Sequence, residues 1–381
     1  MAWELRIQKY NLKDYRKMGV CIYCGTSSPL ISKTIGICLT CLRTGFGSMI
    51  DHIAEVHGKS REPFGLPPAP PRDPEGIACR LCFNSCQIAE GSTGYCGIRS
   101  VSGWKIKGGT RDANVDWYYD HLPTNCVADW VCPGGTGIGY PEYAYSQGPE
   151  LGYKNLAVFY NGCSFNCLYC QNWHFRERVS MSTRVPVSEL ARYVDRKTAC
   201  ICYFGGDPTP QLIHSINVSK KATRENSERI LRVCWETNGS MNQGLLSRMI
   251  EISLRSGGCI KFDLKAWQEG LHLALCGVSN KRTLDNFRLV AHSIKKRPEV
   301  PLLVASTLLV PGYIDGEEVY KIASFISGCS PDIPYSLLGF YPHFLMKDLP
   351  RTTRLQAEEC LQAAREAGLT RVRIGNVHLL S

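Results

Sequence analysis

At 381 residues, of which 44% are hydrophobic and 20% charged, the chain has an ordinary globular composition and room for one large domain and a smaller one. No apolar run approaches the roughly 18 residues of a membrane-spanning helix, and the charged N-terminus lacks the apolar core of a signal peptide. We therefore expect a cytoplasmic protein without a membrane partner. The lysines and arginines behind the formal net charge of +10 are scattered, which gives only weak support for nucleic-acid binding.

The twenty cysteines are the feature of the composition that needs an explanation. In a small secreted protein they would indicate a disulfide scaffold. Here they occur in C-x2-C groupings in a large chain without an export signal, so metal ligation is the better interpretation.

Residues 1–60 are predicted to form a zinc-ribbon-like module. Two C-x2-C pairs lie thirteen residues apart, and four soft ligands paired in this way suit a tetrahedral structural Zn²⁺; the residues are Cys21, Cys24, Cys38 and Cys41. A rubredoxin-like iron site is the alternative. His52 and His57 follow on a short predicted helix, and we expect both to be surface residues because four cysteines already complete the site.

Residues 61–78 are rich in proline and predict an extended linker. The cysteine-rich segment 79–150 follows, and four cysteines within its first eighteen residues resemble a second closed site: Cys79, Cys82, Cys86 and Cys96. The sequence does not decide between zinc and an auxiliary iron–sulfur cluster there. For Cys126 and Cys132 we favour packing as small buried side chains over completion of a neighbouring site. Residues 137–154 are expected to form a loop around the entrance of the next domain.

From residue 155 onward, short apolar runs alternate with helix-prone stretches. Strands are predicted near 155–160, 200–205, 230–236, 259–265, 302–309 and 333–340, with helices near 187–197, 241–255, 281–296 and 316–327. This alternation predicts a parallel sheet, but it does not separate an open sheet from a partial barrel. We assign 151–345 to this core and 346–381 to a C-terminal helix and strand. The last helix, 354–367, should begin at a capping box formed by Thr353 and Gln356 and end at Gly368.

A loop of three cysteines follows the first strand of this core. Cys163, Cys167 and Cys170 have the spacing C-x3-C-x2-C. Three thiolates from one loop can hold three irons of a four-iron cluster and leave the fourth iron open for a small molecule. A zinc knuckle and a disulfide set are the alternatives.

This pattern resembles the radical S-adenosylmethionine (radical SAM) superfamily. The resemblance implies a partial (β/α)6 barrel in which Cys163, Cys167 and Cys170 hold a 4Fe-4S cluster that binds SAM. Reductive cleavage of SAM would give a 5′-deoxyadenosyl radical that abstracts hydrogen from a substrate. The segment CRLCFNSC, with its following EGSTGYCGIR, is similar to the region before the barrel in relatives of pyruvate formate-lyase activating enzyme. That subgroup implies a protein substrate, a glycyl-radical product, and a ferredoxin or flavodoxin as electron donor in an anaerobic cell.

The resemblance also implies which residues bind SAM. Gly205-Gly206-Asp207-Pro208 resembles the GGEP motif that receives the amino group, with aspartate replacing glutamate. The ETNG-like segment with Glu236 and Thr237, and the DLK segment with Asp263 and Lys265, match residues that surround SAM. Tyr169, directly before the last cysteine of the loop, is counted with them. A plain strand-to-helix turn and a structural ion pair at a barrel rim are the alternatives.

The sequence departs from the activating-enzyme pattern in two ways, and three functions are compatible with it. Ser336 stands where the activating enzymes carry a histidine, and His343 is a candidate to compensate. The extra cysteines precede the barrel, whereas activating enzymes usually carry them after its first strand.

The favoured function is glycyl-radical activation of a protein, for which the zinc-ribbon-like module would contact the partner. The alternatives are modification of another protein, an RNA or a small molecule, and a non-enzymatic iron–sulfur or zinc protein acting as scaffold or electron carrier.

Overall fold

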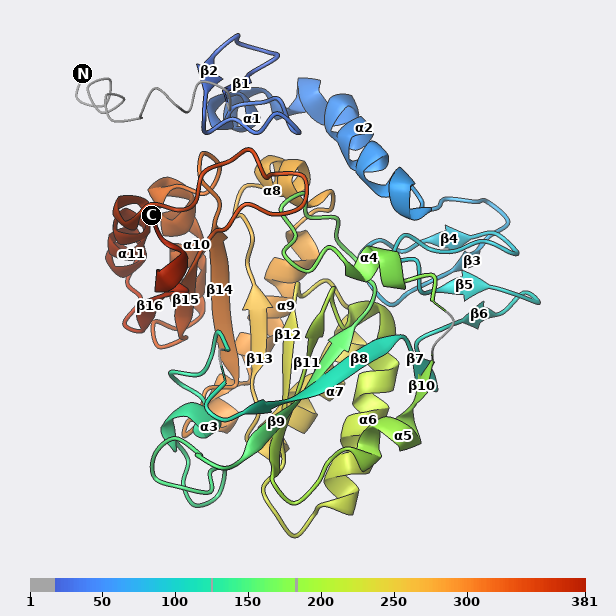
Figure 1. The fold of residues 1–381 in the computed structure, drawn as a ribbon, viewed down its shortest axis with the longest axis vertical. Coiled ribbons are helices and arrows are strands. Elements are labelled where there is room, and N and C mark those ends of the chain that lie inside the picture. Colours follow the sequence, from blue (N-terminus) through green and yellow to red (C-terminus); the bar gives the residue numbers. More distant parts are fainter. Residues whose placement is uncertain (1–17, 125, 182–183) are drawn as a thin grey trace.

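The computed structural model of the chain describes residues 18–124, 126–181 and 184–381. Its centre is an eight-stranded sheet with the order β16-β15-β14-β13-β12-β11-β9-β8 (Figure 1). Seven of these strands run parallel: β9 (Lys154–Tyr160), β11 (Thr198–Gly205), β12 (Arg232–Thr237), β13 (Ile260–Asp263), β14 (Leu303–Leu309), β15 (Tyr335–Gly339) and β16 (Val372–Gly375). The predicted α/β fold with a parallel sheet is confirmed.

Crossover helices connect the parallel strands, as parallel pairing requires. They are α5 (Val187–Arg192), α6 (Leu212–Glu225), α7 (Gln243–Ser256), α8 (Glu269–Cys276), α9 (Lys281–Ala291), α10 (Gly316–Cys329) and α11 (Arg354–Glu366). Thr353 is the N-cap of α11 as predicted, because its side chain accepts a hydrogen bond of 3.1 Å from the backbone N–H of Gln356. The Gln356 side chain donates to the Ile314 carbonyl at 3.0 Å. No helix in these described ranges is long and apolar enough to cross a membrane.

The eighth strand, β8 (Val115–His121), runs antiparallel to β9. It was not predicted, because its outer side chains are exposed aromatic and charged residues rather than an apolar run. β8 and β16 are the two edges of the sheet and do not pair with each other. The sheet is therefore a curved, open barrel.

The N-terminal module lies over the end of the barrel to which the parallel strands point (Figure 1). It contains β1 (Gly19–Val20), β2 (Ser27–Ser28), α1 (Leu39–Gly45), a short 3-10 turn at Phe46–Met49 and the long helix α2 (Ile50–Arg61). Residues 1–17 of the predicted module lie outside the described residues. Arg43 pairs with Asp315 at 2.7 Å, and the Tyr313 hydroxyl donates to the Ile37 carbonyl at 3.1 Å, so the module is fastened to the β14–α10 connection.

Further short elements lie around the barrel (Figure 1). They are a 3-10 turn at Glu62–Phe64, β3 (Ile77–Ala78), β4 (Gln87–Ile88), β5 (Ser100–Val101), β6 (Ile106–Lys107), β7 (Asp112–Ala113), α3 (Pro133–Thr136), α4 (Phe175–Arg178) and β10 (Val185–Pro186). Further 3-10 turns lie at Thr209–Gln211, Ile294–Lys296 and Val377–Leu379.

Two expectations from the sequence are wrong. The loop 137–154 does not surround the entrance but lies at the N-terminal ends of the strands: the Tyr145 hydroxyl donates to the Ile230 carbonyl, and Arg232 donates to the Tyr143 carbonyl. His57 is not a surface residue. It is 4% exposed, because the face of α2 that carries it packs on the barrel instead of facing solvent.

Candidate active site

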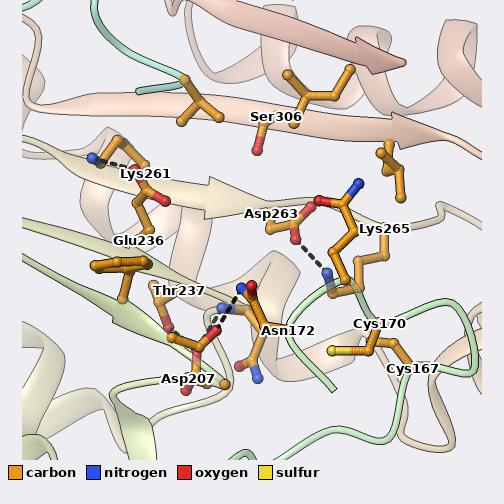
Figure 2. Close-up of a pocket in the computed structure, with 18 of the residues that line it drawn as sticks. Cys167, Cys170, Asn172, Asp207, Glu236, Thr237, Lys261, Asp263, Lys265 and Ser306 are labelled. Atoms are coloured by element: carbon orange, nitrogen blue, oxygen red, sulfur yellow. Dashed lines mark hydrogen bonds and ion pairs between the residues drawn. The ribbon is translucent and has the colours of Figure 1, made fainter. Parts of the chain in front are cut away.

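A cavity of about 380 Å³ opens at the C-terminal ends of the parallel strands. The cysteine loop after β9 lines one side, and the ends of β11, β12 and β13 line the other (Figure 2). The structure thus brings together most of the predicted cofactor-binding residues around one cavity: Cys163, Cys167, Tyr169, Cys170, Gly205, Gly206, Asp207, Glu236, Thr237, Asp263 and Lys265. Pro208 is buried behind them.

The cysteine loop is held by the C-terminal end of α8. Asn166 N–H donates to the Cys276 carbonyl at 2.9 Å, and Leu168 N–H donates to the Leu275 carbonyl at 3.0 Å. The Cys276 thiol is a neighbour that the sequence did not single out. Its hydrogen bond is the main cause that lowers the pKa of Cys167 to about 7, and the positive charge of Lys265 acts in the same direction. A lowered thiol pKa favours the thiolate, which is the form that binds metals.

Asn166, in the middle of the loop, is a fully buried hub. Its amide nitrogen lies 3.0 Å from Nδ1 of His57 and donates to the Ser60 hydroxyl at 2.7 Å, so two residues of α2 hold it. Its amide oxygen accepts from Arg61 at 3.4 Å and from Arg176 at 3.2 Å. The position of the cysteine loop therefore depends on the N-terminal module.

The surroundings of Arg176, on α4, indicate whether the residues present fit an iron–sulfur cluster. It is 2% exposed, and its guanidinium lies 4.6 Å from the ring centres of Phe175 and Phe344. Its Nε and Nη1 atoms have no hydrogen-bond partner in the described chain. Buried donors are normally satisfied, so an acceptor with negative charge is expected beside them. Three thiolates around an iron–sulfur cluster would supply that charge, and the residues present therefore fit such a group.

The glycine pair at the end of β11 allows two loops to touch. Gly205 has φ +124°, and a Cβ atom on Gly206 would lie 2.5 Å from the Gly162 carbonyl oxygen. Only residues without a side chain permit this contact. The adjacent Asp207 accepts hydrogen bonds of 2.8 Å from the Thr237 hydroxyl and from the backbone N–H groups of Asn238 and Thr209. Asp207 thus ties β11 to β12, while burial raises its pKa.

Two acid–base pairs lie side by side on the strands opposite the cysteine loop (Figure 2). Asp263 forms an ion pair with Lys265. Burial opposes the charge of Lys265, but the charges of Asp263, Cys167 and Cys276 outweigh it and raise the Lys265 pKa. The second carboxyl oxygen of Asp263 is buried and has no partner in the described chain, so it is free to accept a hydrogen bond from a ligand.

Glu236 is occupied by a protein cation. The Lys261 ammonium is 3% exposed and lies 2.6 Å from the Glu236 carboxylate. Burial favours protonation of this carboxyl, but the Lys261 charge outweighs that effect and lowers the Glu236 pKa. Any other cation bound at this carboxylate would therefore compete with Lys261.

The structure shows where the two residues of the first departure, Ser336 and His343, lie. The Ser336 hydroxyl donates to the Val127 carbonyl at 2.8 Å and accepts from Trp130 Nε1 at 3.1 Å, so it fastens the loop 126–132 to the barrel. Arg373 on β16 forms an ion pair with Asp129 of the same loop. Among the described residues His343 does not line the cavity, and its ring packs on Tyr341 instead.

The two N-terminal cysteine groups differ in geometry. In the first group every sulfur lies within 4.8 Å of the others: Cys21, Cys24, Cys38 and Cys41. Four sulfurs at 2.3 Å from a tetrahedral zinc would stand about 3.8 Å apart, so this spacing suits one ion. Within the described ranges it is the one group of potential ligands that meets this limit. The second group surrounds a void of about 10 Å³: Cys79, Cys82, Cys86 and Cys96.

Comparison with known proteins tests the resemblance. Residues 157–326 match the radical SAM superfamily, so the resemblance inferred from the cysteine loop is confirmed.

The relatives include activating enzymes. The chain is 30% identical over 185 residues to a protein of Methanocaldococcus jannaschii named as a glycyl-radical enzyme activating enzyme, covering 47% of this chain and 64% of the relative. It is 28% identical to the isethionate sulfite-lyase activating enzyme of Desulfovibrio desulfuricans, covering 44% and 51%. It is 27% identical to the pyruvate formate-lyase-activating enzyme of Staphylococcus aureus, covering 51% and 78%. The chain thus spans between half and two thirds of the first two relatives.

Solved structures align only partly with the chain. A domain of pyruvate-formate lyase-activating enzyme from Bacteroides vulgatus is 20% identical, with 46% of this chain and 98% of that chain covered and a TM-score of 0.36. Streptococcus suis SuiB is 16% identical, with 57% and 49% covered and a TM-score of 0.44.

Proposed function

We propose that this chain is a radical SAM enzyme of the activating-enzyme type, which abstracts hydrogen from a protein substrate. The observation that carries the proposal is that Cys163, Cys167 and Cys170 line the same cavity as the partnerless oxygen of Asp263 and the buried ammonium of Lys265. A cluster site and a polar pocket for a small molecule therefore share one space. The names of the relatives support a protein as the substrate.

The three cysteines would hold a 4Fe-4S cluster and leave one iron open for SAM. Bound together, the cluster and SAM supply a one-electron cleavage whose product removes a hydrogen atom from the substrate. Arg176 contributes positive charge and two unsatisfied donors beside the thiolates. The backbone at Gly205 and Gly206 and the Asp207 carboxylate would orient the amino group of SAM, and the Asp263–Lys265 pair would receive its polar groups.

The protein also shields the cysteine loop from solvent. The cysteines and Tyr169 are largely buried, and the module with α2 covers the cysteine loop. We infer that the first cysteine group binds a structural zinc, because its sulfurs have the spacing of a single tetrahedral ion. The electron would come from a ferredoxin- or flavodoxin-like donor. Glu236 and Thr237, at the end of β12, would line the SAM site beside Asp207, to which the Thr237 hydroxyl donates.

The test is anaerobic reconstitution with iron and sulfide, followed by dithionite, SAM and measurement of 5′-deoxyadenosine. We expect product from the wild type and from a Cys329→Ser control, and a loss of at least a hundredfold in Cys170→Ala. Fully loaded wild-type protein that forms no 5′-deoxyadenosine would contradict the proposal and favour a scaffold or electron carrier.

The substrate class needs a separate measurement. Incubation with a purified glycyl-radical enzyme should give a glycyl signal in electron paramagnetic resonance if the chain is an activating enzyme. Cleavage of SAM without such a signal, across several glycyl-radical enzymes, would favour modification of another protein, an RNA or a small molecule.

A further inference from the structure

A second cavity, of about 120 Å³, lies inside the barrel nearer the N-terminal ends of the strands. Six of the twenty cysteines line it: Cys126, Cys132, Cys200, Cys202, Cys234 and Cys259. None of them belongs to the three groups described above. Cys126 and Cys132 come from the loop before the barrel. The other four lie on, or directly before, three adjacent strands.

The parallel register brings the strand cysteines to one level of the barrel. Cys202 on β11 is the direct neighbour of Cys234 on β12. Cys259 directly precedes β13, next to Cys234, and the sulfurs of Cys234 and Cys259 lie 3.9 Å apart. Side chains two positions apart share one face of a strand. Cys200 therefore lies one level below Cys202 on the same inner face.

The loop 126–132 supplies the other two thiols. Ala128 and Val131 of this loop are buried against Cys259, and Cys126 and Cys132 pack against the same cluster. The contacts of Ser336 with this loop and the Asp129–Arg373 ion pair fix it in place. The arrangement does not depend on a mobile surface segment.

A buried cation faces two of these sulfurs. The Lys261 ammonium lies 3.0 Å from the Cys126 sulfur and 3.1 Å from the Cys202 sulfur, in addition to its contact with Glu236. Cysteines that only fill space behave as small apolar side chains and do not need a charged partner. An ammonium directed at two sulfurs would instead offset part of the negative charge that cysteine thiolates bring to a metal site.

The spread of the sulfurs and the volume of the cavity indicate whether one metal ion or a larger group would fit. In the described part of the chain, these sulfurs do not all lie within the 4.8 Å that marks the Cys21 group, so they are spread more widely than the ligands of one tetrahedral ion. The cavity is also larger than the void of about 10 Å³ among the Cys79 group. Several thiolates around a space of this size suit a group of more than one metal atom.

We propose that this cavity binds a second iron–sulfur cluster, with Cys126, Cys202, Cys234 and Cys259 as its ligands. Cys132 and Cys200 lie beside it as neighbouring thiols. Glu236, Lys261 and Cys126 line both this cavity and the candidate active site. The second cluster would thus lie on the far side of the Glu236–Lys261 pair from the cysteine loop, within the same barrel. The inference rests on the six cysteines and does not require SAM cleavage.

The first test measures iron, inorganic sulfide and zinc per chain after anaerobic reconstitution of the full chain with iron and sulfide. The variant Cys202→Ser/Cys234→Ser should bind about two to four fewer irons, and as many fewer sulfides, than the wild type. The control Cys329→Ser/Cys360→Ala changes two cysteines outside all four groups and should lose neither. Equal iron and sulfide in the wild type and the Cys202→Ser/Cys234→Ser variant would overturn the proposal.

A second measurement does not depend on the folding of any variant. Crystals of the reconstituted wild-type protein should show an anomalous peak at the iron edge between Cys126 and Cys234, separate from the peak at the Cys163 loop. An anomalous signal at the zinc edge alone in this cavity, or no metal there in crystals whose Cys163 loop is loaded, would overturn the proposal.

Discussion

The Nδ2 atom of Asn166, inside the cysteine loop, lies 3.0 Å from Nδ1 of His57, which is 109 residues earlier in the chain on α2. This contact joins the N-terminal module to the loop that would hold the catalytic cluster. The sequence suggested that the module contacts a partner protein. The structure gives it a direct mechanical connection to the site.

His57→Ala should therefore weaken the cysteine loop. It removes one partner of the Asn166 amide nitrogen and the contact of His57 Nε2 with the Ala274 carbonyl at 3.1 Å. Because buried polar groups lose their partners, we expect a destabilisation of about 1–3 kcal/mol in urea unfolding. Less iron should also be retained at the Cys163 loop after reconstitution. His52→Ala, on the same helix, contacts only the Ile35 carbonyl within the module and serves as the control. Equal iron retention in both variants would show that the contact with His57 does not stabilise the cysteine loop.

His57 also predicts a dependence of stability on pH. Burial lowers its pKa to about 4, below the usual value of 6.5. Between these values the unfolded chain binds a proton that the folded chain does not, so the free energy of unfolding falls as the pH is lowered from 6.5 towards 4. His57→Gln should reduce this slope by up to about 1.4 kcal/mol per pH unit. The measurement is urea unfolding at several pH values, with the exposed His378→Gln as the control, which should keep the wild-type slope.

Asp263→Asn tests the polar pocket. The change leaves the buried Lys265 ammonium without its charged partner and weakens the acceptor that faces the cavity. We expect SAM to bind roughly ten- to a hundredfold more weakly, since charge-assisted hydrogen bonds contribute about 1.5–3 kcal/mol. Equilibrium dialysis of the reconstituted protein measures this affinity. Glu251→Gln removes an exposed carboxylate paired with Arg255 at 2.9 Å and should leave SAM binding unchanged. Unchanged affinity in Asp263→Asn would remove this residue from the SAM site.

Cys24→Ser tests the structural metal. The Cys24 sulfur lies 3.7 Å from that of Cys38, and its hydrogen bond with Thr26 is the main cause that lowers its pKa to about 6. Loss of one thiolate from a four-thiolate site should remove about one zinc per chain and lower the thermal midpoint. Metal analysis by mass spectrometry checks this, with Cys329→Ser as the control. One equivalent of iron in place of zinc would support the rubredoxin-like alternative.

Much of the fold and of the candidate site follows from the sequence, because both depend on local patterns. Apolar runs marked the parallel strands, and the spacing of Cys163, Cys167 and Cys170 marked the loop. The motif residues at the strand ends meet in one cavity because parallel strands place their C-terminal ends at one edge. Their roles in binding SAM stay predictions.

Other features depend on contacts that no local pattern shows. Cys202, Cys234 and Cys259 lie in or directly before apolar strands and resemble core residues, and only the register of three strands brings them together. Asn166 lies between Cys163 and Cys167, and no sequence motif marks it as a residue that holds the loop. Asp207 was expected to face SAM, yet its oxygens accept three hydrogen bonds from the protein first.

The unpaired edges of the sheet have a further consequence. Between β8 and β16 the wall is completed by side chains of the loop 126–132, through Ser336 and the Asp129–Arg373 ion pair, and not by a strand ladder. Because Ala128 and Val131 of this loop are buried, moving it outward would expose core side chains and displace Cys126, although the pairing of β15 with β16 would stay intact. The barrel thus has a lateral seam that side-chain packing alone closes, so substitutions in the loop 126–132 can alter both cavities without disturbing the sheet.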